Sequence, residues 1–453
     1  MVRRLLFDVS GLLAWYAYFR HPTGVQRITE HLLSSRPIQD YAHTEFVARA
    51  IGSDVLYSVD RAVLTDLCDQ QRRPLAVAKL RGIFAQGMRL ASPGELLREV
   101  RYFHLPYAFG GILRLETPVA MLFARRFSVR MPALTIVPGP SDADAFFNPG
   151  DFWCHDGYVG SIVEMRRRTG VRFVQLVHDL FAVDRPQWTH PQFGHVIAGG
   201  FERLAPHVDR WLATSRFVRS SLTEYLSAQA LREHQIDVIP MGWKTSEAPA
   251  ADTERDFSRQ VLEKYGLSGK KYILHVGTVE PRKNLMSLIE ALSDLRRQTS
   301  AEIPYCVLVG RQGWRSEDIR KRLESTQFEG GMVMWLKSVS DRELAALYRG
   351  AEFAVVPSIT EGWGLPIRES LAHGLPCIAS RVGGMEEAGQ DLAAYFEPDD
   401  VDGLRSAISR WIFNQEALRQ ARARIELHFK SDAGSLGWDA AGAAVVRAAF
   451  ETV

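Results

Sequence analysis

The chain has 453 residues, of which 46% are hydrophobic and 24% charged, and its formal net charge is only +2. This length predicts two or three domains, each large enough to bury a core of its own. A nearly neutral chain argues against nucleic-acid binding, because that function usually shows as a marked excess of basic side chains.

The chain opens with a charged lead, Met1–Arg4, before a short apolar strand expected over Leu5–Val9. The lead lacks the long apolar core and the small-residue cleavage site of a signal peptide. No stretch reaches roughly 18 uninterrupted apolar residues, so no membrane-spanning helix is expected. The four cysteines lie far apart without a CxxC or Cys/His cluster, which is typical of a reduced protein without a metal centre. We therefore expect a cytoplasmic protein whose contact with a membrane, where it has any, is peripheral.

Short apolar runs in the first half predict further strands. They lie at Phe46–Ile51, Asp151–His155, Arg172–Val177, Arg210–Thr214 and Asp237–Pro240. The stretch Ser246–Asp256 is polar and rich in Pro and Ala, so it predicts the connection between two domains.

Residues 70–130 differ from the rest of the chain in charge, with eleven Lys or Arg against three Glu. Large apolar side chains such as Phe84, Phe103 and Phe123 are interleaved with the basic ones. This mixture is typical of an amphipathic surface that lies on anionic lipid. A helical insertion that packs on the first domain with a solvated basic face explains the composition as well, so both interpretations stay open.

Strands and helices alternate more regularly in the second half. Strands are expected at Tyr272–Gly277, Tyr305–Gly310, Met332–Leu336, Phe353–Pro357 and Pro376–Ser380. Helices are expected from Lys283 to about Arg297, near Ser316–Leu323, over Asp341–Arg349 and from Pro366 onward. Strands that alternate with helices predict an α/β fold with a parallel sheet covered on both faces.

Two glutamates stand in the glycine-rich segment Ser358-Ile-Thr-Glu361-Gly-Trp-Gly-Leu-Pro366-Ile-Arg-Glu369. The segment follows a buried strand, its glycines allow a tight turn, and Pro366 suits the first turn of a helix. Ligands bind at the carboxyl ends of parallel strands, and free N–H groups at a helix N-terminus attract phosphate. We therefore expect Glu361 and Glu369 to face one cavity, where their carboxylates accept hydrogen bonds from sugar or ribose hydroxyls.

Glu361, seven residues and Glu369 together resemble the EX7E motif of the family-four retaining glycosyltransferases, which have the GT-B fold. Segments that look like the same family are Val276–Asn284, Val339–Tyr348 and Arg381–Glu387. The resemblance is strong over roughly residues 270–440. It implies two facing Rossmann-like domains with parallel sheets. These are an acceptor-binding domain of about 1–245, a nucleotide-sugar-binding domain of about 255–430, and a helix in 431–453 that returns to the first domain.

The resemblance assigns roles in binding a nucleotide-sugar donor. The donor leaves as a nucleoside diphosphate, whose developing negative charge must be stabilised by cations, helix N-termini or metal. By resemblance, Lys283 binds the diphosphate, Glu369 binds the ribose hydroxyls, and Glu361 lies at the reacting face of the sugar. Many relatives carry Arg where this chain has Thr278, which leaves open whether Arg282 supplies a second cation. The other residues expected around the donor are Gly24, Gly277, Gly362 and Leu365.

Two segments of the first half also look like the family. His21–Arg27 resembles the glycine loop that faces the diphosphate and the acceptor, and it contains Gly24. His178 and Asp179 end a predicted strand, where relatives often have a His near the scissile bond. The resemblance implies that His178 contacts the donor sugar or the acceptor, and that Asp179 orients His178 or binds the acceptor.

The implied reaction moves a hexose with retention at the anomeric carbon, without a covalent nucleophile, a cofactor or a metal. The segment after Gly277 and the His-Asp pair look most like bacterial mannosyltransferases of polysaccharide assembly. GDP-mannose is therefore the first expected donor, with UDP-hexose and dTDP-rhamnose as open alternatives. The expected acceptor is a glycan or a polyprenyl-diphosphate-linked glycan at the cytoplasmic membrane face.

Three alternative functions remain. Asp142-Ala-Asp144 matches the DxD motif of metal-dependent transferases with the other major fold, although it lies in a predicted loop. A GT-B phosphorylase would need a pyridoxal lysine, whose sequence context is not seen. A catalytically inactive GT-B scaffold that binds glycan or a partner transferase is disfavoured by the presence of Arg282, Lys283, Glu361 and Glu369.

Overall fold

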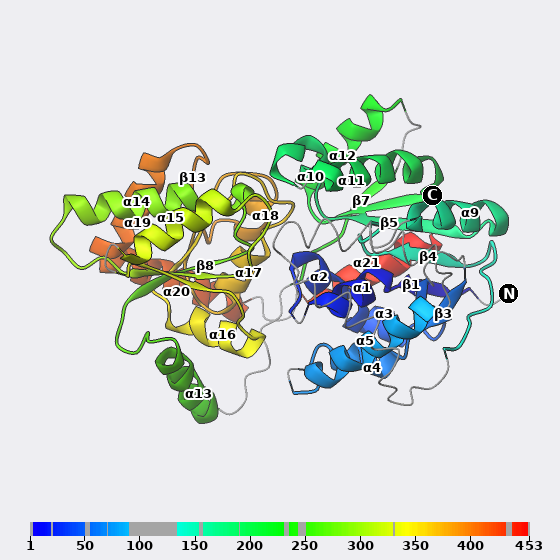
Figure 1. Ribbon diagram of the computed structural model, residues 1–453, viewed down its shortest axis with the longest axis horizontal. Coiled ribbons are helices and arrows are strands. Elements are labelled where there is room, and N and C mark those ends of the chain that lie inside the picture. The colour runs from blue at the N-terminus through cyan, green and yellow to red at the C-terminus, as the bar shows by residue number, and fades with distance from the viewer. Residues whose placement is uncertain are drawn as a thin grey trace. The chain divides into compact units, whose positions relative to one another are not determined.

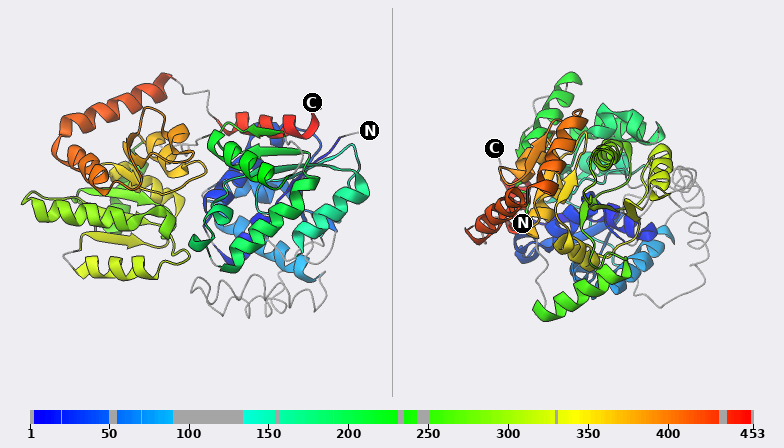
Figure 2. Two further views of the ribbon diagram at one scale, coloured as in Figure 1. Left: turned by 90° about the horizontal axis from the view of Figure 1, so that it is seen from above. Right: turned by 90° about the vertical axis from the view of Figure 1, so that its left-hand side faces the viewer.

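The chain forms two compact α/β units in the computed structural model, each a mainly parallel sheet with helices on both faces (Figures 1 and 2). Unit 1 comprises residues 1–242 and 438–453, and unit 2 comprises residues 243–437. The structure describes residues 3–19, 21–49, 55–69, 71–89, 134–153, 157–189, 191–230, 235–242, 251–328, 331–431 and 437–451.

The sheet of unit 1 has the order β3-β2-β1-β4-β5-β6-β7. Its strands are parallel except β3, which is antiparallel to β2. The strands are β1 (Leu5–Asp8), β2 (Thr44–Arg49), β3 (Leu56–Ser58), β4 (Ala145–Asn148), β5 (Arg172–Val177), β6 (Arg210–Ala213) and β7 (Ile236–Val238). The helices are α1 (Ser10–Tyr18), α2 (Gly24–Ser34), α3 (Arg36–Asp40), α4 (Arg61–Asp66), α5 (Arg73–Arg89), α9 (Tyr158–Thr169), α10 (Phe181–Asp184), α11 (Pro191–Leu204), α12 (Arg216–Ala228) and α21 (Trp438–Phe450).

Aromatic side chains fill the core of unit 1 on both sides of this sheet. The ring of Phe7 lies 5.5 Å from that of Phe46 and 5.0 Å from that of Phe147. The next residue back along β4, Phe146, packs instead against Phe173, at 6.0 Å between ring centroids. Successive side chains of a strand point to opposite faces. Phe146 and Phe147 therefore anchor different helical layers.

Helix α21 belongs to unit 1 although unit 2 precedes it in sequence. It packs on α2 and α3 and against strands β4, β5 and β6, and it is drawn in red in Figure 1. The Trp438 ring stacks on that of His31, with 4.7 Å between their centroids. Gly442 approaches Ser35 so closely that a Cβ would overlap the Ser35 hydroxyl.

The sheet of unit 2 is parallel throughout and has the order β10-β9-β8-β11-β12-β13. Its strands are β8 (Tyr272–Val276), β9 (Tyr305–Val309), β10 (Val333–Leu336), β11 (Ala354–Val356), β12 (Cys377–Ser380) and β13 (Ala394–Phe396). Its helices are α13 (Ala251–Lys264), α14 (Leu285–Gln298), α15 (Glu317–Phe328), α16 (Asp341–Gly350), α17 (Leu365–Ala372), α18 (Met385–Gly389), α19 (Val401–Phe413) and α20 (Gln415–Ser431).

Two apolar cores lie on the two faces of this second sheet. Leu274 of β8 joins a core with helices α13, α16, α17 and α18, whereas its neighbour Ile273 joins a core with α14, α15 and α19. Both side chains are fully buried. Strands buried on both faces read as continuous apolar runs, which explains why the sequence located β8 to β12 within about one residue. The short strand β13 was not predicted.

Three local expectations are wrong. The strand expected at Asp151–His155 is instead β4, and Phe152 is buried from a turn, where its ring packs on that of Phe201 at 4.9 Å. The connection expected over Ser246–Asp256 gives way to helix α13 at Ala251, where Glu254 forms ion pairs with arginines of α16.

The third error concerns the helix expected from Lys283. Pro281–Lys283 forms a single 3-10 turn, and Asn284 adopts a left-handed conformation with φ of 53°. Helix α14 begins only at Leu285. Arg282 and Lys283 therefore belong to the loop after β8 rather than to a helix.

Candidate functional site

The second sheet reverses its winding direction between β8 and β11. From β8 the chain continues outward to β9 and β10, and from β11 it continues outward to β12 and β13 on the other side. Open α/β sheets bind ligands at such a point, beside the carboxyl ends of the two central strands. The loop Gly277–Lys283 follows β8 and the loop Ser358–Gly364 follows β11, so both emerge there.

Two cations and two carboxylates meet in these loops. Glu361 bonds through Oε1 to the Lys283 ammonium and through Oε2 to Arg282 Nη1, the latter at 2.9 Å. Ser358 Oγ donates to Glu361 Oε1 at 2.8 Å. Arg282 Nε also lies 2.6 Å from Glu280 Oε1. The side chains of Lys283 and Glu361 are only 6% and 10% exposed, so the cluster is a buried group of balanced charges.

The cluster fixes the charge of Glu361. Burial raises the pKa of this carboxyl, but the positive charges of Lys283 and Arg282 outweigh burial and lower the pKa to about 2. Burial and the neighbouring Arg282 lower the pKa of Lys283, an effect that the Glu361 carboxylate opposes. Glu361 is therefore an anion at neutral pH.

Glu369 lies on α17 in a different environment. Tyr348 of α16 donates its hydroxyl to Glu369 Oε2 at 3.0 Å. His373 bonds through Nδ1 to the Glu369 backbone carbonyl at 2.8 Å and stacks on the Tyr348 ring at 5.0 Å. The structure thus groups Glu361 with the two cations and holds Glu369 against Tyr348, a contact that the sequence did not predict.

Close backbone approach explains the glycines of these loops. Gly362 is buried, and a Cβ on Gly384 would overlap its carbonyl oxygen. Gly364 has φ of 105° and precedes Leu365, the first residue of α17. A Cβ on Gly277 would lie 3.3 Å from both Lys283 Cε and His275 Nε2. The missing side chain at Gly277 therefore leaves room for the Lys283 stem.

His275, which the sequence reading passed over as a strand residue, lies directly beneath this loop. Its Nδ1 bonds to the Val355 carbonyl oxygen at 2.9 Å. Burial lowers its pKa to about 4, so the ring is neutral at physiological pH. Only its place at the end of a strand that leads into a glycine loop could have drawn attention to it.

Unit 1 has its own point of reversal, between β1 and β4. Asp8 and Asn148 end these strands, and both are buried. Asn148 Nδ2 donates to Asp8 Oδ2 at 2.9 Å. Burial raises the pKa of nearby Asp151 to about 7, although the hydrogen bond from Gln26 opposes this. The sequence reading missed these polar residues because each follows an ordinary apolar strand.

The remaining expected site residues lie in unit 1. His178 follows β5 and is 8% exposed, and its Nε2 lies 2.6 Å from the Pro149 carbonyl oxygen. Burial lowers the pKa of His178 to about 4. Asp179, the next residue, is half-buried. Gly24 is exposed at the first position of α2, after Thr23, which forms a capping box with Gln26.

Residues 256–427 match the family model of the glycosyl transferases group 1. This stretch lies in unit 2, contains both Glu361 and Glu369, and is similar to the group 1 glycosyl transferases. This finding confirms the family resemblance drawn from Glu361 and Glu369.

Curated proteins that are similar to this chain include bacterial mannosyltransferases. The O-antigen chain mannosyltransferase B of Escherichia coli is 36% identical over 148 residues, which are 33% of this chain and 38% of that protein. The serotype-specific mannosyltransferase WbdA of Escherichia coli is 25% identical over 257 residues, which are 55% of this chain and 31% of that protein. The chain thus spans about a third of the length of these relatives.

Solved structures confirm the GT-B fold of this chain over nearly its whole length. A sucrose-phosphate synthase from Thermosynechococcus elongatus has a TM-score of 0.55 at 18% identity, with 98% of each chain covered. HepE of Anabaena, in complex with UDP and glucose, has a TM-score of 0.59 at 13% identity, with 98% of this chain and 99% of that chain covered.

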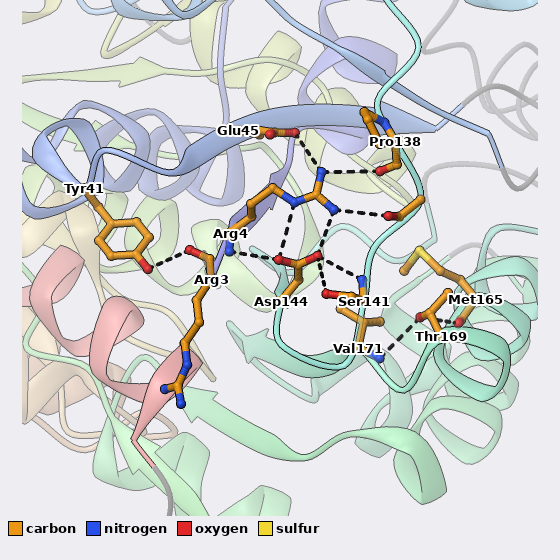
Figure 3. Close-up of polar contacts among 11 residues, drawn as sticks. Arg3, Arg4, Tyr41, Glu45, Pro138, Ser141, Asp144, Met165, Thr169 and Val171 are labelled. Carbon is orange, nitrogen blue, oxygen red and sulfur yellow. Dashed lines mark hydrogen bonds and ion pairs between the residues drawn. The ribbon is translucent and has the colours of Figure 1, made fainter. Parts of the chain in front are cut away.

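The DxD alternative is not supported, because Asp144 has a structural role (Figure 3). Its Oδ2 lies 2.8 Å from Arg4 Nη2, its Oδ1 accepts the Arg4 backbone N–H at 2.9 Å, and Ser141 N donates to Oδ2 at 2.9 Å. Asp144 is 2% exposed. Its carboxylate ties the loop before β4 to the start of β1.

Two further expectations concern a metal site and a membrane-spanning helix. Within the described residues, no group of three or more His, Cys, Asp or Glu could hold a metal ion. In the same residues no helix is long and apolar enough to cross a membrane. The basic stretch 70–130 lies mostly outside the described residues, and only its first part, in α5, is seen.

Proposed function

We propose that this protein is a glycosyltransferase that moves a hexose from a nucleotide sugar to a glycan or polyprenyl-diphosphate-linked acceptor, with retention at the anomeric carbon. The observation that supports this function is the buried pair Lys283 and Arg282 at the reversal point of the second sheet. A nucleoside diphosphate is the leaving group of such a reaction, and preorganised cations stabilise its charge.

In this proposal Lys283 and Arg282 bind the diphosphate, with backbone of Gly277 and Gly24 close to it. Glu369, held by Tyr348, accepts hydrogen bonds from the ribose hydroxyls. Glu361 faces the donor sugar beside the diphosphate, with Gly362 and Leu365 forming the adjacent wall. His178 contacts the transferred sugar, and Asp179 contributes to binding of the acceptor.

The first proposed donor is GDP-mannose, and the setting is assembly of a bacterial surface polysaccharide. Relatives that are named mannosyltransferases of O-antigen chains support this choice. UDP-hexose and dTDP-rhamnose are the alternatives that a binding experiment separates. The proposed reaction needs no cofactor and no metal ion.

The test is calorimetric titration of GDP, UDP and dTDP without metal, on the wild type and on Glu369→Ala. We expect one nucleotide, GDP first, to bind the wild type, and the variant to bind it at least tenfold more weakly. The titration is then repeated with magnesium and with EDTA, and equal affinities are expected. Binding of no nucleotide, together with no turnover of any nucleotide sugar, would favour the inactive scaffold instead.

We further propose that the protein works in the cytoplasm, with the basic stretch 70–130 resting on anionic lipid where the acceptor is presented. Eleven Lys or Arg against three Glu in this stretch support the proposal. The test is flotation with phosphatidylglycerol vesicles at low and high salt. Recovery of the protein away from the vesicles at low salt would contradict it.

A further inference from the structure

The loop after β4 in unit 1 is built around the side chain of Asn148, which is 1% exposed. Asn148 Nδ2 donates to Asp8 Oδ2 at 2.9 Å and to the Tyr158 hydroxyl at 2.8 Å. Its Oδ1 accepts the Gly150 backbone N–H and Gln175 Nε2, each at 2.9 Å. A primary amide has two N–H donors and two lone pairs on oxygen, so all four capacities are used and the amide has a single orientation.

This network holds two residues that lie against the His178 ring, Pro149 and Gly150. Pro149 follows Asn148, and its carbonyl oxygen lies 2.6 Å from His178 Nε2. Gly150 has φ of 126°, and a Cβ there would overlap the imidazole ring. The imidazole ring of His178 therefore lies between the Pro149 carbonyl and the Gly150 backbone. The hydrogen bonds of Asn148 hold both residues in place.

The contact with Pro149 sets the tautomer of His178. A carbonyl oxygen can only accept, so Nε2 must carry the hydrogen. Burial lowers the pKa of His178 to about 4, which leaves the ring neutral and Nδ1 with a lone pair. Among the residues that the structure describes, this buried Nδ1 has no hydrogen-bond partner. A buried acceptor without a donor is costly, which favours a donor supplied by a bound molecule.

We propose that Asn148 is a positioning residue for sugar transfer: it holds the Pro149–Gly150 turn so that His178 presents Nδ1 as a hydrogen-bond acceptor to a hydroxyl of the sugar. This inference rests on the proposed function. His178 then receives a hydrogen bond from the substrate and donates no proton to it. Asn148 touches no substrate and acts through His178.

The first measurement is the tautomer of His178, by nitrogen NMR of histidine-labelled protein without ligand. The variant His178→Gln identifies the signal. In the wild type we expect Nδ1 to be the unprotonated nitrogen. In Asn148→Ala we expect a mixture of tautomers, because the Pro149 carbonyl is no longer held. A wild-type ring protonated on Nδ1 would overturn the proposal whatever the outcome of activity measurements.

The second measurement is a double-mutant cycle on GDP release from GDP-mannose, with an α-mannosyl oligosaccharide as acceptor. Asn148→Ala is expected to lower kcat/KM about a hundredfold, the effect of misplacing a group by roughly 1 Å. In a His178→Ala background, adding Asn148→Ala should change kcat/KM by less than about twofold, because coupled residues are not additive. Full additivity, or an unchanged rate in Asn148→Ala, would refute the positioning role.

A matched glycine pair separates positioning from a general loss of stability. Gly150→Ala places a methyl group against the His178 ring, and it should lower kcat/KM as much as Asn148→Ala does. Gly157 also has positive φ, of 71°, but an added Cβ meets nothing within 4 Å. Gly157→Ala should retain activity despite its backbone strain. Equal losses in the two variants would count against the proposal.

Binding of nucleotide by calorimetry distinguishes failure of this inference from failure of the proposed function. The cations that should bind the diphosphate lie in unit 2, whereas Asn148 lies in unit 1. The nucleotide affinity of Asn148→Ala should therefore match that of the wild type. No nucleotide binding to the wild type would refute the proposed function itself, whereas normal binding and normal turnover in Asn148→Ala would refute only the positioning role.

Discussion

Glu361 forms ion pairs with both cations of the candidate diphosphate site. Its two oxygens pair with Lys283 and Arg282, and Glu280 pairs with Arg282 as well. A diphosphate that enters must compete with a carboxylate for the same buried charges. We therefore expect Glu361, the residue proposed to face the sugar, to lower the affinity of the site for the product nucleotide.

Glu361→Gln should bind the nucleoside diphosphate more tightly than the wild type, by about tenfold, which corresponds to about 1.4 kcal/mol. Transfer should nevertheless fall, because the carboxylate beside the sugar is gone. Calorimetry and single-turnover rates on the same preparation measure the two effects. The control is Glu369→Gln, which should weaken nucleotide binding, and weaker binding in both variants would contradict the competition.

Glu361→Gln should also be less stable without ligand, since it leaves two buried cations without their shared partner. The folded pKa of Glu361 is about 2, below its ordinary value of 4.5. A lowered carboxyl pKa contributes stability above pH 4.5 that is lost as the pH falls toward 2. The stability difference between wild type and variant should therefore shrink over that window.

At the scale of elements, α16 and α17 are joined by one polar contact at the site. Tyr348 of α16 donates to Glu369 of α17, while Tyr272 of β8 donates its own hydroxyl to the Leu347 carbonyl of α16 at 2.7 Å. Both tyrosines are buried, and Tyr348 bonds a candidate site residue whereas the Tyr272 hydroxyl bonds a backbone carbonyl.

Removing the Tyr348 hydroxyl should weaken nucleotide binding about three- to tenfold, because Glu369 loses the donor that orients it. Tyr348→Phe should cost about 1 kcal/mol of stability, typical of one hydrogen bond. Tyr272→Phe should cost a similar amount of stability and leave nucleotide affinity unchanged. Calorimetry and denaturant unfolding of the two variants provide the comparison, and equal nucleotide affinities would rule out orientation by Tyr348.

The elements of unit 2 show which features of the fold can be predicted from the sequence and which cannot. Apolar runs such as Tyr272–Val276 located the strands, because burial on both faces leaves little room for polar residues. Lys283 was placed on a helix because periodicity alone cannot reveal that Asn284 adopts φ of 53°. Asn148 was missed for a related reason: two of its four partners, Asp8 and Gln175, lie 140 and 27 residues away in the sequence, and no local pattern records such contacts.

At the scale of the whole molecule, the chain passes from unit 1 to unit 2 and back again. Helix α21 packs on strands β4, β5 and β6 of the first sheet. In the sequence, the whole of unit 2 separates this helix from those strands. The apolar face of α21 includes Trp438 and Val445, which are buried. The core of unit 1 is therefore complete only when both ends of the described chain are present.

Gly442→Ala tests how tightly α21 packs. Alanine favours a helix over glycine, but here its methyl group would overlap the Ser35 hydroxyl, so we expect a loss of about 1–3 kcal/mol. The control is Gly160→Ala in α9, where an added Cβ meets nothing within 4 Å, and a gain of about 0.5–1 kcal/mol is expected. Stability changes of opposite sign, measured by thermal unfolding of the two variants, would support this packing. A gain in stability in both variants would contradict it.

The return of α21 has a consequence for how the protein is made. A ribosome releases the strands of unit 1 first, then all of unit 2, and only afterwards the helix that closes the first sheet. Unit 2 can pack its own two cores during synthesis. The surface of β4, β5 and β6 that α21 contacts is not covered by that helix until synthesis ends. A chain truncated before Trp438 would thus keep the candidate nucleotide site but expose the apolar sheet surface that α21 covers. Chaperones bind and proteases degrade incompletely folded chains of this kind.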